Sequence, residues 1–307
     1  MIELCHDILR LSCPEVHEDA VCDISFQRTL RVPDDNEAYP LPAGLGAFPL
    51  EYTARYADRA PKAWSAAPGV FLPMYQSEAM WMSFGAVRSE SHYPFALKIA
   101  AGEINAVSGN AMAEGLSRRE QDYIVLPDQP WLDGFCIHEG YIRQFIAMRL
   151  GEGYTAEEQL TGRAEHGGVR FMAYPMKRER YEELERVELD MPDLDMCVMS
   201  CQSESMGLAP GGVMEQAIYQ DSYGPDAWDL AHGVACTLHI ANSRDYLRIT
   251  GRCPPTLPAT EEQYREAGIP WFKYYNADAN VLRGAPRLAA LSSVKARGVE
   301  LGVVSGV

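Results

Sequence analysis

The sequence predicts a strand-rich α+β fold, with mainly antiparallel sheets, a few short helices and long ordered loops. Apolar and polar residues alternate in many short segments, such as "CDISFQRTLRV" at residues 22–32 and "VACTLHIAN" at residues 234–242. This period of two is typical of half-buried strands. Segments with helical spacing are fewer and do not alternate regularly with the strands, which argues against a parallel βαβ sheet.

The expected strands are spread over the whole chain. Each is an apolar or alternating run, bounded by residues that favour turns. The segment "PDQPWLDGF" at residues 127–135 has the composition of a turn between two such runs. We expect strands within residues 22–32, 69–86, 93–109, 123–126, 142–150, 167–176, 211–221 and 234–242.

Four segments are expected to form helices. Capping boxes begin at Thr155 and Thr260, and a glycine that can end the helix follows each of them, at Gly162 and Gly268. Residues 176–188 carry opposite charges at helical spacing, which is typical of a solvated helix. A further helix is expected to begin at Asn110, within "NAMAEGLSRRE".

The chain of 307 residues is long enough to bury a large core. We expect residues 1–21 to be an N-terminal appendage, because they show no clear period. Residues 22–294 are expected to form a single continuous strand-rich domain, and residues 295–307 a C-terminal tail. The acidic stretch at residues 188–196 is a possible boundary inside that domain.

The charge excludes two classes of partner. With 27 basic and 43 acidic side chains the net charge is −16, so the surface repels phosphate backbones and anionic lipids. We therefore expect no nucleic-acid or membrane binding. The N-terminal residues lack the pattern of a secretory signal, and no apolar run is long enough for a membrane helix, so a cytoplasmic location is expected. A small molecule, a protein or a second copy of the chain remains as partner.

The eight cysteines do not have the spacing of a disulfide framework, and no CxxC pair occurs. Cys197 and Cys201 lie close to Met199 in an unusually sulfur-rich segment. Thiolates and thioethers are the ligands that Cu(I) prefers, so these three residues could bind copper or another soft metal. The alternative is that they are buried side chains that fill a core.

The sequence also lacks the standard catalytic signatures. It contains no GxGxxG or GxxxxGK[ST] motif, no GxSxG elbow and no HExxH pair. Dinucleotide-binding, P-loop, α/β-hydrolase and zinc-protease sites are therefore disfavoured, and the sequence identifies no cofactor.

Several long motifs carry a resemblance to a known family. They include "QRTLRVPDD", "LPMYQSEAMW", "PDQPWLDG" and "RQFIAMRLGEGYTAEEQLTG". Over residues 22–294 the chain resembles a family of hypothetical proteins from bacteria and fungi. The family has no established activity, so the resemblance implies no mechanism.

Residues 121–162 contain the strongest candidate for a site, and they allow two interpretations. In the structural one, Asp133 and Gly134 form a turn and Trp131 is buried between two strands. In the functional one, Asp133 and a second carboxylate perform acid–base chemistry, His138 transfers protons and Arg143 holds an anionic group. The second carboxylate would be Glu78 or Glu103. Lys98 could replace Arg143, and Cys136 is a possible nucleophile.

These interpretations lead to two classes of function. The missing signatures favour a non-enzymatic protein that binds a ligand or another protein, or assembles with itself. The alternative is an enzyme with a carboxylate-based acid–base site around Asp133, Glu78 and Arg143. A deep pocket in which these side chains converge would favour the enzyme.

Overall fold

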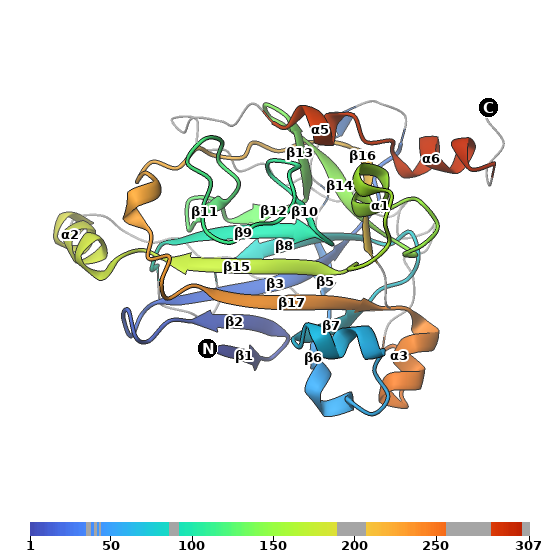
Figure 1. Cartoon of the computed structure of the whole chain (residues 1–307), viewed down its shortest axis with the longest axis horizontal. Coiled ribbons are helices and arrows are strands. Elements are labelled where there is room, and N and C mark those ends of the chain that lie inside the picture. The colour runs from blue at the N-terminus through green and yellow to red at the C-terminus, as the bar shows by residue number, and fades with distance from the viewer. Residues whose placement is uncertain are drawn as a thin grey trace.

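The computed structural model describes residues 1–34, 38–39, 42, 44–85, 92–188, 207–255 and 284–302. Within these ranges the chain forms two β-sheets with short helices around them, which confirms the strand-rich α+β class (Figure 1). The strand order of sheet A is β1-β2-β3-β8-β14-β16-β4, with β5, β12 and β13 paired beside this path. The order of sheet B is β10-β9-β15-β17-β7-β6, with β11 beside β9.

The elements have the following bounds. Sheet A contains β1 (Ile2–Cys5), β2 (Ile8–Ser12), β3 (Val21–Thr29), β4 (Ala38–Tyr39), β5 (Gly44–Ala47), β8 (Ala79–Phe84), β12 (Trp131–Leu132), β13 (Gly134–His138), β14 (Tyr141–Met148) and β16 (Gly207–Glu215). Sheet B contains β6 (Glu51–Tyr52), β7 (Val70–Pro73), β9 (Phe95–Ala101), β10 (Ile104–Asn105), β11 (Ile124–Leu126), β15 (Val169–Pro175) and β17 (Val234–Ala241). The helices are α1 (Ala156–Thr161), α2 (Arg178–Glu188), α3 (Ser243–Thr250), α5 (Pro286–Ala289) and α6 (Val294–Glu300), with 3-10 turns η1 (Thr53–Tyr56), η2 (Lys62–Ala66) and η3 (Pro225–Ala227).

The two sheets pack face to face through an apolar core. Phe26 of β3 contacts Phe171 of β15 with ring centroids 5.7 Å apart, and both side chains are buried. In Figure 1 the strands β9, β15 and β17 overlie β8 and β3. Side chains alternate between the two faces of a strand. Phe26 and every second residue from it in β3 therefore point toward sheet B, and the residues between them point away from it. We call this second side the outer face of sheet A.

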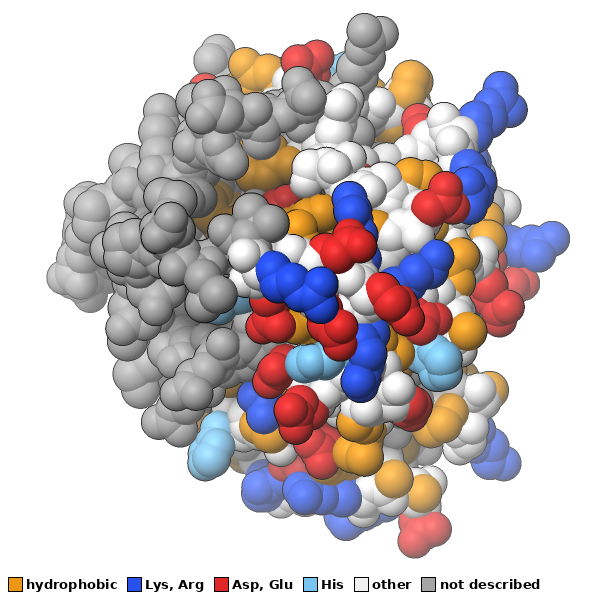
Figure 2. Space-filling model, turned by 90° about the vertical axis from the view of Figure 1, so that its left-hand side faces the viewer, with side chains coloured by type: hydrophobic (Ala, Val, Ile, Leu, Met, Phe, Trp, Pro, Cys, Tyr) orange, Lys and Arg blue, Asp and Glu red, His pale blue; other side chains and the backbone are white. Residues whose placement is uncertain are grey.

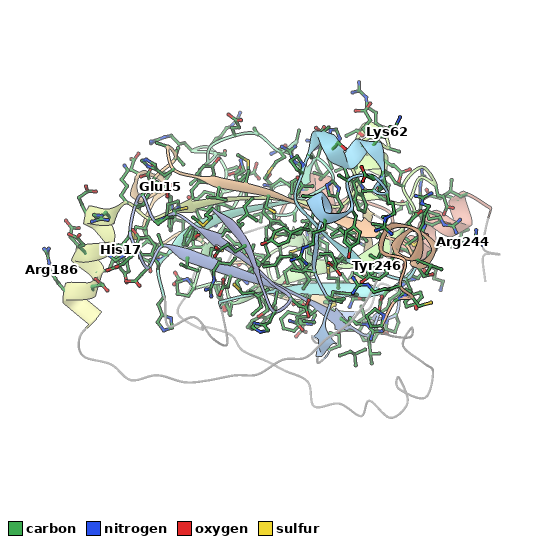
Figure 3. The ribbon with its side chains drawn as sticks, turned by 90° about the horizontal axis from the view of Figure 1, so that it is seen from below. Glu15, His17, Lys62, Arg186, Arg244 and Tyr246 are labelled. Carbon is green, nitrogen blue, oxygen red and sulfur yellow. The ribbon has the colours of Figure 1, made fainter. Side chains whose placement is uncertain are left out.

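The helices lie mainly at the ends of the sheets. Figure 3 shows α2 at one end, with Arg186 on it and His17 nearby, and α3 with Tyr246 at the opposite end. The predicted helix after Thr155 is confirmed as α1, with a complete capping box and Gly162 as a left-handed C-cap. The charged segment is confirmed as α2. The predicted helix at residues 260–268 lies outside the described residues.

The helix expected from Asn110 is wrong, because residues 110–120 form bends and an isolated bridge. The buried Lys98 ammonium donates hydrogen bonds to the carbonyls of Ala113 and Gly115, each at 2.7 Å. It also forms an ion pair with Asp122 at 2.8 Å. The carbonyls of Ala113 and Gly115 thus accept hydrogen bonds from Lys98 and not from the N–H groups of a helix. Here a tertiary contact overrides the helix propensity of the segment.

The N-terminal residues form two strands of sheet A, and helix α6 near the other end of the chain packs on this sheet. Residues 1–21, expected as an appendage, include β1 and β2, and β2 pairs with β3 over five residues. Leu9 and Leu11 of β2 are fully buried, so these strands belong to the sheet. Near the other end, Ser293 caps α6, Val294 is buried against Ile146 and Ala209, and α6 contacts β16. Part of the expected tail is therefore packed on the sheet.

The segment expected to be a turn is one in its first part, where residues 127–129 form a turn and a bend after β11, but from Trp131 onward it is a strand that changes partner. Trp131 and Leu132 of β12 pair with β8, and from Gly134 onward β13 pairs with β14. A Cβ atom on Gly134 would lie 1.9 Å from the carbonyl oxygen of Arg143. Only glycine allows so close a backbone approach, so the Asp133–Gly134 pair marks a step between two strands.

Candidate functional site

Asp133 lies at the point where β8 and β14 separate. Its carbonyl accepts a hydrogen bond from the Phe145 amide at 3.0 Å, and its own amide donates to Gln216 Oε1 at 2.9 Å. Gln216 Nε2 also donates to the Trp131 carbonyl at 3.2 Å. The backbone on both sides of Asp133 is therefore fixed by buried amides, and the carboxyl group has a defined position.

The Asp133 carboxyl is buried, and no basic side chain in the described ranges forms an ion pair with it. The residue is 3% exposed, and burial raises its pKa to about 8, although a hydrogen bond with the Trp131 side chain lowers it. Its Oδ2 atom has no hydrogen-bond partner in the described part of the chain. Because an ionised carboxylate is poorly solvated in such a place, Asp133 is mainly protonated at neutral pH.

Two further buried polar atoms lie on the neighbouring strands. Gln27 of β3 is directly opposite Trp81 of β8. Gln27 Oε1 and Trp81 Nε1 are both buried, and neither has a hydrogen-bond partner among the residues that the structure describes. Gln27 is 1% exposed, and its Nε2 atom donates to Ser25 Oγ at 3.0 Å.

These three side chains form one row across sheet A. Phe26 faces sheet B, so Gln27 and its partner Trp81 lie on the outer face. Trp131 is opposite Ser83, which lies on the same face of β8 as Trp81, and the Asp133 carboxyl forms a hydrogen bond with the Trp131 side chain, so this carboxyl also lies on the outer face. We call Gln27, Trp81 and Asp133 the outer row. A buried polar group without a partner costs about 1–3 kcal/mol, so three of them together require an explanation.

Glu78 is the other buried carboxylate, and its surroundings are different. It accepts hydrogen bonds from Arg28 Nε at 2.6 Å and from the Tyr75 amide at 3.0 Å. Burial raises its pKa to about 7, although Arg28 lowers it. Arg28 follows Gln27 in β3 and points to the opposite face, so this ion pair lies on the side of sheet A that faces sheet B.

The other predicted site residues do not join Asp133. Among the described residues, Asp133 forms neither a hydrogen bond nor an ion pair with Glu78, Arg143 or His138. Arg143 donates to the Gly211 carbonyl at 3.2 Å, its Nε atom has no partner among described residues, and burial lowers its pKa. His138 is exposed at the end of β13. Among the described residues, hydrogen bonds and ion pairs of these side chains therefore do not hold a Glu78–Arg143–Asp133 constellation together.

The remaining candidates have structural partners or lie elsewhere. Glu103 forms an ion pair with His166 at 3.2 Å. Cys136 is buried, and burial raises its thiol pKa to about 12, which disfavours a thiolate nucleophile. The predicted soft-metal residues Cys197, Met199 and Cys201 lie outside the described residues, so copper binding stays a prediction. Elsewhere, the described residues contain no group of three His, Cys, Asp or Glu side chains that could hold a metal.

Sequence reasoning identified Asp133 but missed Gln27 and Trp81. Both residues belong to segments that were predicted as strands, and their positions place them on the faces opposite Phe26 and Met82. That alternation was the only available signal, and it does not show which strands are neighbours.

Comparisons with protein-family models, with curated proteins and with solved structures return no match. The resemblance of the sequence motifs to a family therefore stays a prediction. No helix within the described ranges is long and apolar enough to cross a membrane.

Proposed function

We propose that this chain is a small-molecule-binding protein whose ligand contacts the outer row. The observation that carries the proposal is a set of three buried polar atoms on one sheet face, Gln27 Oε1, Trp81 Nε1 and Asp133 Oδ2, which have no hydrogen-bond partner among the residues that the structure describes. Native proteins rarely leave such groups unsatisfied. A ligand that bonds to them would recover the free energy lost by their desolvation.

The charge of the row supports an uncharged ligand. Gln27 and Trp81 are neutral, and Asp133 is mainly protonated at neutral pH because of its burial. A charged ligand would be buried here without a countercharge, which is costly. An uncharged ligand with polar groups would instead complete the hydrogen bonds of the row.

The surface charge supports a macromolecular partner less than the outer row supports a small molecule. On the side of the molecule shown in Figure 2, acidic and basic side chains are interleaved rather than gathered into an area of one sign. The net charge of −16 also disfavours polyanionic partners.

The enzyme alternative has weaker support. A carboxylate-based acid–base mechanism needs two carboxyl groups that reach one substrate. Glu78 is held by Arg28 at 2.6 Å on the side that faces sheet B, whereas Asp133 belongs to the outer row. Binding is therefore the better proposal.

A thermal-shift screen of uncharged polar compounds tests this function. The informative variant is Trp81→Phe, which removes the unpartnered indole N–H. The matched control is Trp228→Phe, because Trp228 Nε1 already donates to Asp221 at 2.9 Å. We expect at least one compound to stabilise the wild type and Trp228→Phe but not Trp81→Phe. A screen without hits, or hits that stabilise all three proteins equally, would contradict the proposal.

A further inference from the structure

A cavity lies on the side of sheet B that faces away from sheet A. Phe171 of β15 packs on Phe26 of sheet A, so the alternation of side chains places Met172 and Tyr174 on the opposite side. These two residues line a cavity of about 320 Å³ together with Ala235, which is opposite Met172 in β17. We call this space the sheet B cavity.

The floor and one wall of the sheet B cavity are apolar and open to solvent. Ala235 is exposed, although β17 lies between β15 and β7 inside the sheet. Leu230, from the loop before β17, also lines the cavity and is 47% exposed. Ligand sites in proteins have volumes of about 300–1,000 Å³, so this cavity suits a small ligand. An apolar body that covered Ala235, Leu230 and Met172 would be stabilised by the area removed from water.

The opposite wall carries Glu114 on a backbone that buried side chains hold in place. The carbonyls on both sides of it, of Ala113 and Gly115, accept hydrogen bonds from Lys98 Nζ, each at 2.7 Å. The Gly115 amide donates to the Tyr174 hydroxyl at 2.8 Å. Gly115 has a φ of 70°, a conformation that glycine adopts without strain. The position of Glu114 at the cavity is therefore set before a ligand arrives, which lowers the cost of binding.

Glu114 gives the cavity a negative charge. It is the one charged residue among those that line the cavity, all of which lie in described ranges. Its carboxylate forms no hydrogen bond or ion pair with another described residue. Burial raises the pKa of Tyr174, and the charge of Glu114 raises it further, so this charge acts at the Tyr174 hydroxyl. The nearby Lys98 ammonium does not neutralise it, because Lys98 is paired with Asp122 at 2.8 Å.

We propose that the sheet B cavity is a further binding site, and that it takes a small amphipathic amine. The ammonium group would pair with the Glu114 carboxylate, and the apolar body would lie on Met172, Leu230 and Ala235. A carboxylate of the same shape would be repelled by Glu114, and a neutral alcohol would lack the attraction between charges. The site is independent of the outer row, since it lies on the other sheet and selects a cation.

Two substitutions separate the charge of the site from its shape. Glu114→Gln removes the charge and keeps the size of the side chain. Its matched control is Glu120→Gln, the same change at an exposed position in the same loop that does not line the cavity. Ala235→Ile fills the floor of the cavity and keeps Glu114. Isoleucine suits a strand, and Ala235 is exposed, so we expect this variant to fold.

The test compares 2-phenylethylamine with 2-phenylethanol and 3-phenylpropionate by ligand-observed NMR at low ionic strength. We expect the amine to bind about fivefold more tightly than the alcohol, the size expected for an exposed ion pair, and the carboxylate to bind most weakly. Glu114→Gln should abolish the preference for the amine, and Glu120→Gln should leave it unchanged. Ala235→Ile should weaken the amine and the alcohol by a similar factor. Added salt should weaken only the amine.

The contrary outcomes refute the sheet B cavity as an amine site and leave the proposed function standing. These are no amine binding, equal binding of amine and alcohol, or the same loss in Glu114→Gln and Glu120→Gln. Weaker amine binding in Trp81→Phe but not in Ala235→Ile would place the amine in the outer row instead.

A fourth compound distinguishes a free amine from a lysine side chain of another protein. n-Butylamine has the shape of a lysine side chain and covers less of the apolar floor than 2-phenylethylamine does. We therefore expect it to bind several-fold more weakly. Equal binding of the two amines would indicate a lysine of a partner protein and refute the small-molecule ligand.

Discussion

The burial of Asp133 predicts an unusual dependence of stability on pH. Its carboxyl group has a pKa of about 8 in the folded chain, against an ordinary value of 3.8. Between these two pH values the folded chain keeps the proton, and the unfolded chain has lost it. Unfolding then releases a proton, so the free energy of unfolding falls as the pH rises.

The size of this effect follows from the pKa difference. One pKa unit corresponds to about 1.36 kcal/mol, so a rise of about four units lowers the stability by roughly 5 kcal/mol between pH 4 and pH 8. The amide of Asp133→Asn cannot ionise, and it keeps an acceptor for Trp131 and a donor in place of the carboxyl O–H. We expect this variant to match the wild type near pH 4 and to exceed its stability by several kcal/mol at pH 7.5.

Urea denaturation of both proteins at intervals between pH 4.5 and 8.5 measures this difference. Glu78, whose pKa is raised to about 7, also makes the free energy of unfolding fall as the pH rises toward 7. Both proteins contain Glu78, so this contribution cancels in the difference between their stabilities. Asp58→Asn removes a carboxylate from an exposed position and controls for net charge. Parallel stability curves for the wild type and Asp133→Asn would refute the assignment of a neutral buried carboxyl group.

Two further substitutions test the burial of Trp131 and the strength of the Arg28–Glu78 ion pair. Trp131 is 9% exposed, so Trp131→Ala should lower the free energy of unfolding by roughly 3–5 kcal/mol in urea denaturation, whereas a loss below about 1 kcal/mol would contradict its burial. Glu78→Gln should cost about 3–5 kcal/mol because it removes the carboxylate that accepts from the buried Arg28 guanidinium. The double variant Glu78→Gln/Arg28→Met should recover part of that loss, and an additive loss would show that the pair is not coupled.

The sequence by itself determined the local structure of many segments. The alternation in residues 22–32 predicts β3, because a strand with one core-facing side needs apolar residues at every second position. The capping box at Thr155 predicts α1, because the groups that begin this helix are all supplied within a few residues. Asp133 could be singled out because it begins a turn-forming Asp-Gly dipeptide, although in the structure this dipeptide marks a step between two strands.

Only the tertiary structure decided what these residues do together. Lys98 prevents a helix after Asn110 by binding carbonyls about fifteen residues away in the chain, a contact that no local pattern contains. The outer row depends on strand order and register, which bring Gln27, Trp81 and Asp133 to one face of the sheet from three distant segments. The high pKa of Asp133 comes from burial by the folded chain, so neither the site nor its charge exists before the sheets have packed.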